Sequence, residues 1–253
     1  MAKSKHFKSK RCERILSVDI STLTKREILK IIALRTKEKK RTVIFTPNPQ
    51  MLLGEQRLKQ NRRLLNSADI NIPDGIGIVI ASRLTGGKIR ARISGIDLAE
   101  SILALSEACG YRVFLLGAER GIAKKAAKKI KKRFQNINIC GTHHGYFNKF
   151  GEENKKIIKA INKKNPDIIF VCMGYPTQEK WIIENAPSIL SARIFIGLGG
   201  ALDVWSGKTQ RAPLLFKIMG LEWLYRTVKE PRRAKIFWDI PVFLFKALIH
   251  KKS

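Results

Sequence analysis

The chain has 253 residues, of which 44% are hydrophobic, which suits one large α/β domain or a domain with an appendage. Its 50 Lys and Arg against 20 Asp and Glu give a net charge of +30, which favours polyanionic partners such as nucleic acid, anionic membranes or phosphorylated substrates. The four cysteines form no CxxC pair, which argues against a zinc or redox site. Residues 1–14 lack the apolar core of a secretory signal and no apolar run approaches ~18 residues, so a cytoplasmic protein is expected.

Strand-like and helix-like runs alternate along most of the chain. Strands are predicted at Ile15–Ile20, Thr42–Thr46, Ile70–Ile72, Val113–Leu116, Ile137–Cys140, Asp167–Cys172 and Arg193–Ile196. Helices are predicted after Ser21, over about 96–108, up to Arg133, near 152–163 and over 178–184. This alternation predicts an α/β core over residues 1–206, with a mainly parallel sheet flanked by helices.

The pattern changes after Gly207, where no further β-rich run occurs. Two helical apolar stripes follow: one over 221–228 and an aromatic one over 236–248, with Pro241 expected to kink or break the second helix. Basic residues flank these stripes, so residues 207–253 are predicted to form an amphipathic appendage that lies on an anionic membrane surface. The alternative is that both stripes pack on the sheet or on another subunit.

Two polar segments follow predicted strands directly: Thr46-Pro47-Asn48-Pro49-Gln50 and Ile72-Pro73-Asp74-Gly75. The carboxyl ends of parallel strands are where ligands bind in open α/β sheets. Asp74, a carboxylate between Pro and Gly on a very basic chain, is the strongest candidate for chemistry. The structural alternatives are that Asp74 is a turn residue and that Thr46 and Asn48 cap the next helix.

Glycine-rich turns follow two further predicted strands. The turn Gly117–Gly121 resembles a phosphate-cradling loop, but the spacing and the downstream acid of a dinucleotide fingerprint are missing, which disfavours a nicotinamide-dependent oxidoreductase. The turn Gly197–Gly200 allows a ligand to approach the backbone closely. His143 and His144 are adjacent without a partner at ligand spacing, so a metal site is disfavoured.

Eight motifs occur in a fixed order, and together they resemble the WecG/TagA/CpsF family of bacterial glycosyltransferases (glycosyltransferase family 26) over about residues 15–240. They are Thr46–Gln50, Ile72–Gly75, Arg92–Gly95, Gly141–Phe147, Gly174–Glu179, Gly199–Asp203, Arg211–Pro213 and Gly220–Arg226. Two positions depart from the family pattern: Thr177 stands where Lys is common, and Ala91 where Glu is common.

The resemblance implies a Rossmann-like core with a membrane-approaching appendage. It also implies metal-independent, inverting transfer of a sugar, typically N-acetylmannosamine or a derivative, from a UDP-sugar to undecaprenyl-diphosphate-linked N-acetylglucosamine. Such enzymes build teichoic acids and other surface polysaccharides. We therefore expect an enzyme without a cofactor that lies peripherally on the inner face of the cytoplasmic membrane. An oligomeric form is compatible with this expectation.

The same resemblance suggests roles for individual residues. Asp74 is the expected base that takes the proton from the acceptor hydroxyl. The expected acceptor-binding residues are Thr46, Asn48 and Gln178. The expected donor-binding residues are Gly199, Gly200, Arg92, Arg211, Arg226 and one of Arg232 and Arg233, because guanidinium groups bind phosphate oxygens in place of a metal.

The main alternative from another class is a basic nucleic-acid-binding α/β protein, which the net charge of +30 and pI near 10.4 favour. Such a protein would interleave stacking aromatics with basic residues along one groove. Here many aromatics lie in the C-terminal stripes instead, which favours lipid over nucleic acid. A scaffold without activity would leave the polar strand ends unexplained.

Overall fold

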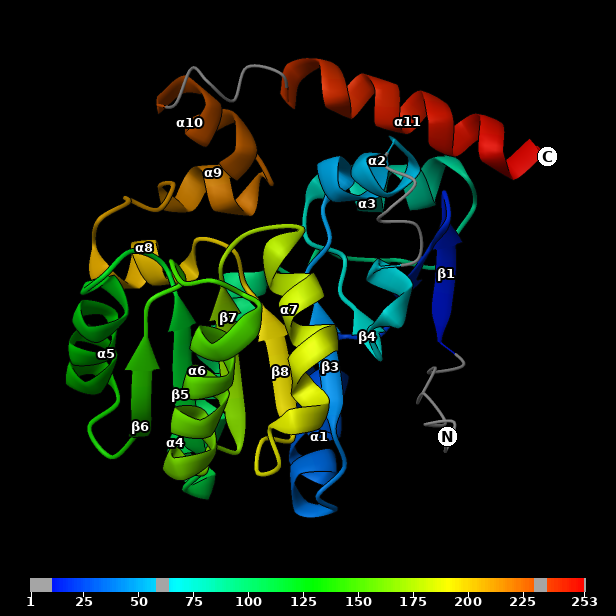
Figure 1. The fold of residues 1–253 in the computed structure, drawn as a ribbon. Coiled ribbons are helices and arrows are strands. Elements are labelled where there is room, and N and C mark those ends of the chain that lie inside the picture. Colours follow the sequence, from blue (N-terminus) through cyan, green and yellow to red (C-terminus); the bar gives the residue numbers. More distant parts are fainter. Residues whose placement is uncertain (1–10, 58–63, 230–235, 253) are drawn as a thin grey trace, which may run out of the picture. The chain divides into compact units, whose positions relative to one another are not determined.

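A computed structural model describes residues 11–57, 64–229 and 236–252 (Figure 1). The chain divides into two compact units that are discontinuous in sequence. Unit 1 comprises Met1–Thr24, Thr46–Ser94 and Arg211–Ser253, and unit 2 comprises Lys25–Phe45 and Gly95–Gln210. The chain therefore passes from one unit to the other several times.

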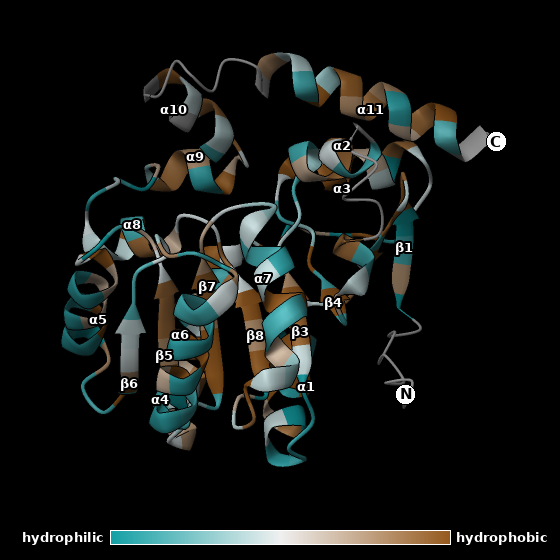
Figure 2. Ribbon diagram, in the orientation of Figure 1, coloured by the Kyte–Doolittle hydropathy of each residue, from teal (hydrophilic) through white to brown (hydrophobic). Residues whose placement is uncertain are grey.

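Five parallel strands form the sheet of unit 2. In spatial order they are β3 (Thr42–Phe45), β8 (Ile194–Gly197), β7 (Ile168–Cys172), β5 (Arg112–Gly117) and β6 (Asn138–His143). Every residue of β3, β7 and β8 is buried, which is why these strands are apolar runs rather than alternating ones. Figure 2 shows the strands β7 and β8 in brown. The predicted mainly parallel α/β sheet is confirmed.

Helices connect these strands and pack along the sheet. They are α1 (Lys25–Lys37), α4 (Gly95–Cys109), α5 (Ile122–Arg133), α6 (Gly151–Lys164), α7 (Thr177–Asn185) and α8 (Ala201–Ser206), with a 3-10 turn, η3, at Ala186–Ser188. Each strand is followed by a loop at its carboxyl end and then, in most cases, by a helix. This places the loops after β5, β6, β7 and β8 at one edge of the sheet.

Unit 1 is mostly helical. It contains the hairpin β1 (Cys12–Ile15) and β2 (Val18–Ser21), α2 (Pro49–Arg57), the 3-10 turn η2 (Leu65–Ser67), β4 (Ile70–Asn71), α3 (Ile76–Leu84), α9 (Leu214–Ile218), α10 (Glu222–Lys229) and α11 (Ile236–Lys252). Helix α11 packs against α2 and α3. Its Phe243 is fully buried there, and Gln50 in α2 donates to Asp239 in α11 at 3.1 Å.

The single strand predicted at Ile15–Ile20 is wrong, because the chain turns at Leu16 and Ser17. Strands β1 and β2 pair antiparallel on either side of this turn, with Ile15 opposite Val18. Leu16 has a φ of 55°, the left-handed conformation that tight hairpin turns require. The sequence contains no Gly, Asn or Pro at this point that would have indicated a turn.

A kink or a break was predicted at Pro241, and the break is wrong, because α11 continues through this residue (Figure 1). A proline inside a helix removes one backbone hydrogen bond. The burial of Phe243 and Ala247 beyond it stabilises the helix against α2 and α3, which offsets that loss.

Candidate active site

The two proline-containing loops of unit 1 lie against each other. The backbone N–H of Asp74 donates to the carbonyl oxygen of Pro47 at 3.1 Å. Gly75 has a φ of 119°, and a Cβ on it would lie 3.2 Å from Cδ of Pro49. Glycine is therefore required here both by the backbone conformation and by the close approach of the second loop. The predicted motifs after β3 and β4 are thus in direct contact.

The candidate base and the two predicted acceptor-binding residues of these loops differ in their burial. Thr46 is buried, whereas Asn48 and Asp74 are half-buried. The Oδ1 of Asn48 accepts the backbone N–H of Met51 at 3.0 Å, so this side chain caps α2. The capping role considered from the sequence is therefore present, and the Nδ2 group of the same side chain is a hydrogen-bond donor.

The third predicted segment of unit 1, Arg92–Gly95, adjoins the same loops. The N–H of Ile93 donates to the carbonyl oxygen of Pro73 at 2.9 Å, directly before Asp74. This hydrogen bond places the backbone of Arg92 next to the loop that carries the candidate base.

Glu222, at the start of α10, holds two of the predicted arginines. Its Oε2 accepts from Nη1 of Arg92 at 2.7 Å, and its Oε1 lies 3.4 Å from Nε of Arg211. The Nη2 of Arg92 also donates to the carbonyl oxygen of Lys217 at 3.1 Å. The three charged side chains are only 15%, 11% and 16% exposed, so the carboxylate compensates two cations that are largely removed from water. Glu222 lies within the predicted motif Gly220–Arg226, but its spacing alone indicated no role for it.

The structure describes little of the other predicted donor-binding arginines. Arg226 belongs to α10, four residues after Glu222. Its side chain, and the whole of Arg232 and Arg233, lie outside the described residues.

A cavity of about 710 Å³ lies in unit 2 at the carboxyl ends of β5, β6, β7 and β8. This is the position of ligand sites in open parallel sheets, and the volume is within the usual range for such sites. Both predicted glycines, Gly199 and Gly200, line it. The other lining residues are Ala118, Gly145, Tyr146, Phe147, Asn148, Lys149, Glu153, Cys172, Met173, Gly174, Thr177 and Asp203.

Gln178 connects two of the loops around this cavity. Its Oε1 accepts the backbone N–H groups of Gly199 at 2.9 Å, Gly174 at 3.2 Å and Met173 at 3.3 Å. Its Nε2 donates to Oε1 of the buried Glu179 at 2.8 Å. Because the side chain is 2% exposed and these bonds are all internal, Gln178 fixes the shape of the loops after β7 and β8. Its contact with an acceptor sugar stays a prediction.

Lys149 is the one residue with a cationic side chain among the described residues that line the cavity. Its Nζ donates to the carbonyl oxygens of Gly145 at 2.5 Å and Phe147 at 2.6 Å, and lies 4.2 Å from the centre of the Phe147 ring. Burial lowers the pKa of this ammonium, and Glu153 opposes that shift. An ammonium has three N–H donors, so one N–H remains beyond these two bonds. No motif in the sequence distinguished this lysine from the many others.

Asp203, on α8, is a second carboxylate that lines the cavity, besides Glu153. Burial raises its pKa, and the neighbouring Glu119 acts in the same direction, while Lys208 opposes them. The Nζ of Lys208 lies 2.6 Å from Oε1 of Glu119 and 4.0 Å from Oδ1 of Asp203. Asp203 ends one of the eight sequence motifs but had no predicted role.

His143 and His144 make local contacts in the loop after β6. The Nδ1 of His143 lies 2.8 Å from the carbonyl oxygen of His144, and the N–H of Tyr146 donates to Nδ1 of His144 at 3.2 Å. Across the described parts of the chain, no three His, Cys, Asp or Glu side chains gather as a metal-binding group.

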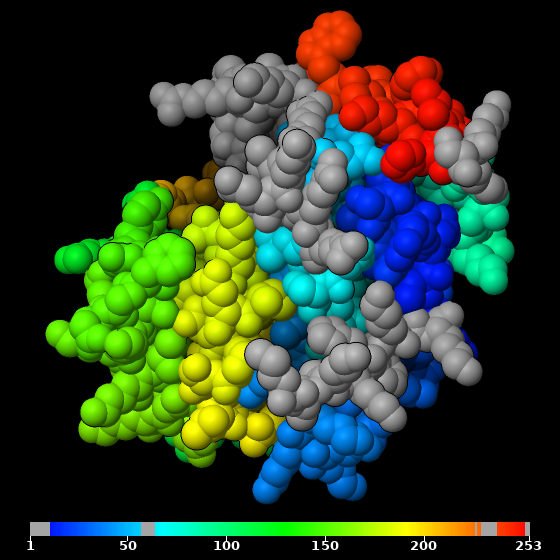
Figure 3. All heavy atoms as spheres, turned by 45° about the vertical axis from the view of Figure 1, so that its right-hand side comes forward, coloured from blue at the N-terminus to red at the C-terminus, as the bar shows by residue number. Residues whose placement is uncertain are grey.

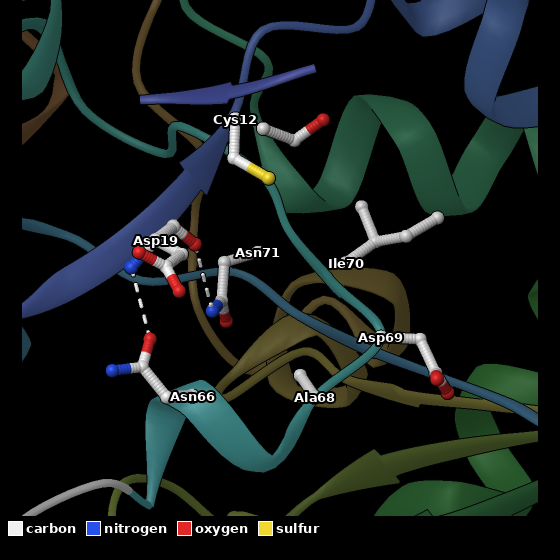
Figure 4. A pocket seen from close by; sticks show the side chains of 8 residues that line it. Cys12, Asp19, Asn66, Ala68, Asp69, Ile70 and Asn71 are labelled. Carbon is white, nitrogen blue, oxygen red and sulfur yellow. Dashed lines mark hydrogen bonds between the residues drawn. The ribbon is translucent and has the colours of Figure 1, made fainter. Parts of the chain in front are cut away.

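A second, much smaller cavity lies in unit 1 between β2, η2 and β4 (Figure 4). Its volume is about 20 Å³, which is room for one water molecule. Nδ2 of Asn71 donates to the carbonyl oxygens of Asp19 and Leu65, and the N–H of Asp19 donates to Oδ1 of Asn66. This cavity is too small for a sugar and we assign it no role in catalysis.

Large apolar side chains are exposed on α9 and α11. The α11 residues form part of the surface drawn in red in Figure 3. The exposed residues on and next to these two helices include Leu214, Leu215, Ile218, Met219, Phe237, Trp238, Phe245 and Ile249. Within the described residues, none of the helices is both long enough and apolar enough to span a bilayer.

Comparison with known proteins decides the family. A sequence model of the glycosyl transferase WecG/TagA/CpsF family matches residues 13–253, nearly the whole chain. The chain belongs to this family. The resemblance drawn from the eight motifs is thereby confirmed, and so is the assignment to the glycosyltransferases.

Three relatives of this family member share one name, N-acetylglucosaminyldiphosphoundecaprenol N-acetyl-beta-D-mannosaminyltransferase. The protein of Bacillus subtilis (strain 168) is 36% identical over 211 residues, which is 83% of this chain and 80% of the relative. That of Bacillus spizizenii (strain W23) is 33% identical over 216 residues, 85% and 82% of the two chains. That of Staphylococcus aureus (strain MRSA252) is 33% identical over 210 residues, 83% and 81%.

Proposed function

We propose that this chain transfers N-acetylmannosamine, or a derivative of it, from a UDP-sugar to N-acetylglucosamine on undecaprenyl diphosphate. This reaction would serve the synthesis of teichoic acid or another surface polysaccharide. The observation that supports it best is the shared name of relatives that are 33–36% identical over more than four-fifths of this chain.

The cavity of unit 2 is the proposed donor site. The remaining N–H of Lys149 suits a phosphate oxygen, and glycines at Gly199 and Gly200 let a phosphate approach the backbone. The carboxylate of Asp203 suits ribose hydroxyls, which donate hydrogen bonds to it. Tyr146 adds an exposed aromatic ring on which a uracil base can stack.

Asp74 is the proposed general base. In an inverting displacement the acceptor oxygen forms a bond to the anomeric carbon of the donor while the bond from that carbon to the UDP oxygen breaks. The hydroxyl proton passes to the Asp74 carboxylate, and UDP leaves with the bonding electron pair. Thr46 and Asn48 would orient the acceptor sugar, since their loop contacts the Asp74 loop directly.

Arginines are proposed to stabilise the charge on the departing diphosphate without a metal. Arg92 and Arg211 are held by Glu222, which limits the freedom of both guanidinium groups before substrate binds. Arg226 and one of Arg232 and Arg233 are proposed to bind the diphosphate as well, on the basis of the family resemblance alone.

The enzyme is proposed to work as a peripheral protein on the inner face of the cytoplasmic membrane. Its acceptor would be anchored in that membrane by a polyprenyl chain. The exposed aromatic and aliphatic side chains of α9 and α11 suit insertion into the interface region of a bilayer.

A panel of UDP-sugars tests the proposal. Purified enzyme is mixed with each donor and a polyprenyl-diphosphate-linked N-acetylglucosamine in detergent, with and without EDTA, and UDP release is measured. We expect release with UDP-N-acetylmannosamine or a derivative, unaffected by EDTA, and an inverted anomeric configuration of the product by NMR. No release with any donor would contradict the transferase assignment to this substrate pair. Loss of release with EDTA would contradict the metal-independent mechanism alone.

A further inference from the structure

The outer face of α5 carries a high density of positive charge. The helix has twelve residues, and seven of them are Lys or Arg. We call these seven exposed side chains the basic face of α5: Lys124, Lys125, Lys128, Lys129, Lys131, Lys132 and Arg133. The buried face consists of Ala123, Ala126, Ala127 and Ile130, and the helix packs on α8 and the sheet. Figure 2 shows most of α5 in teal.

Part of this arrangement is unfavourable for the helix itself, although Lys131, Lys132 and Arg133 lie in the last turn, where the helix dipole favours cations. Lys124 and Lys125 lie in the first turn, where the helix dipole favours acids, and this turn contains no acid. Lys124 and Lys128 are four residues apart, as are Lys128 and Lys132, and like charges at this spacing repel each other. Across the described residues, the ion pair of Arg133 with Glu100, at 3.1 Å, is the one that neutralises a cation of this face.

The next helix along the chain, α6, has the usual distribution of charge. It is also lysine-rich, but Glu152 and Glu153 occupy its first turn, and Glu152 pairs with Lys155 at 2.7 Å. High lysine content alone therefore does not explain α5, because α6 combines lysines with acids at the positions that stabilise a helix. The uncompensated charge of α5 indicates a partner outside the chain.

We infer that the basic face of α5 binds an anionic membrane surface through lipid headgroups. Clusters of four to eight Lys and Arg are typical of sites for anionic lipids. The helix contains no aromatic residue on which nucleic-acid bases could stack, and no exposed apolar residue that could insert among acyl chains. The contact is therefore electrostatic, unlike the apolar contact proposed for α9 and α11. The choice of a membrane rests on the proposed function, because a lipid-linked acceptor brings the enzyme to one.

Vesicle co-sedimentation of the full-length protein tests this inference. The vesicles contain phosphatidylcholine with or without phosphatidylglycerol. The test variant is K124Q/K125Q/K128Q/K131Q, and the control K30Q/K37Q/K156Q/K159Q removes the same charge from exposed positions of α1 and α6. We expect the test variant to bind phosphatidylglycerol vesicles at least about tenfold more weakly than wild type at about 150 mM salt. The control should lose less than about twofold.

Three outcomes would overturn the inference. The test variant could bind like wild type, or the control could lose as much as the test variant, which would show an effect of net charge alone. Wild type could also bind an RNA oligonucleotide more tightly than the vesicles at the same salt concentration, with a dependence on the same lysines. A thermal melt checks folding, and its midpoint should not fall because the change removes repulsion.

Transfer to a detergent-solubilised acceptor separates this inference from the proposed function. That activity should be equal in wild type and the test variant. If wild type shows no transfer, the proposed function fails, while the vesicle experiment still decides whether the basic face of α5 binds anionic lipid.

Discussion

The guanidinium of Arg92 donates to Oε2 of Glu222 at 2.7 Å, and this contact joins segments 130 residues apart in the sequence. Arg211 approaches the other oxygen of the same carboxylate. One acid at the start of α10 thus positions two arginines that had been predicted separately as phosphate ligands. Both are proposed to be oriented before substrate arrives.

Replacing Glu222 should therefore reduce stability as well as activity. Glu222→Gln leaves two largely buried arginines without a compensating charge, so we expect the free energy of unfolding to fall by about 3 kcal/mol in urea denaturation. Glu152→Gln, which removes an exposed ion pair with Lys155, should change it by less than about 1 kcal/mol. If both variants lost the same free energy of unfolding, Glu222 would not act as the charge that compensates two buried arginines.

Asp74→Asn should leave the fold intact and lower kcat by at least about 10²-fold, because an amide cannot accept the acceptor proton. UDP release under saturating substrates measures this effect, and a thermal melt measures folding. Glu38→Gln, a change of the same chemistry at a carboxylate that pairs with Lys40, is the control and should retain activity. An unchanged kcat in Asp74→Asn would remove this residue from the mechanism.

Gln178→Leu should disturb the loops after β7 and β8. It leaves three backbone N–H groups and the Glu179 carboxylate without the hydrogen bonds that Gln178 provides, and each such loss typically costs about 1–3 kcal/mol. We expect a lower melting temperature together with weaker UDP binding in calorimetry. Gln135→Leu, at an exposed glutamine, should change neither property. Normal stability in Gln178→Leu would contradict the role assigned to this side chain.

Lys149→Met should weaken the binding of UDP by about tenfold or more, because one charged hydrogen bond to a phosphate is lost. Uridine has no phosphate, so its affinity should be unchanged if the loop keeps its shape. Lys156→Met, at an exposed lysine of α6, is the matched control. A parallel loss of uridine and UDP binding would assign Lys149 to loop structure rather than to phosphate recognition.

Lowering the pH should weaken UDP binding, because the Asp203 carboxylate becomes protonated. Burial raises the pKa of this carboxyl, so it becomes protonated at a higher pH than an ordinary aspartate and can then no longer accept two ribose hydroxyls. Its contribution to stability has the opposite sign: the folded state binds this proton more readily than the unfolded state, so the contribution rises as the pH falls. Calorimetric titrations against pH test this, and Asp203→Asn should flatten the profile of UDP affinity. An unchanged profile in Asp203→Asn would exclude Asp203 as the titrating group.

Local patterns were sufficient for much of the fold. The runs Thr42–Thr46 and Asp167–Cys172 predicted strands of a mainly parallel sheet, and the observed strands β3 (Thr42–Phe45) and β7 (Ile168–Cys172) match them to within one residue at one end. The hairpin at Leu16 was missed because its turn uses a residue that rarely adopts a positive φ. A helix over 236–248 was predicted correctly, but the break at Pro241 was not, because the packing of α11 on α2 and α3 stabilises it and local propensity does not include such contacts.

Some residues of the candidate site could likewise be predicted from the sequence, and others could not. Ordered motifs with their spacing were enough to identify the family and to single out Asp74, Thr46 and Asn48, since these signals lie in short continuous segments. The roles of Gln178, Glu222 and Lys149 came only from the tertiary structure. Each acts through hydrogen bonds or ion pairs whose partners lie in other loops or are backbone groups, and a chain read residue by residue shows neither burial nor the direction of a side chain. The sequence by itself therefore determined the class of enzyme and the strand ends, and folding decided which polar groups are held in place there.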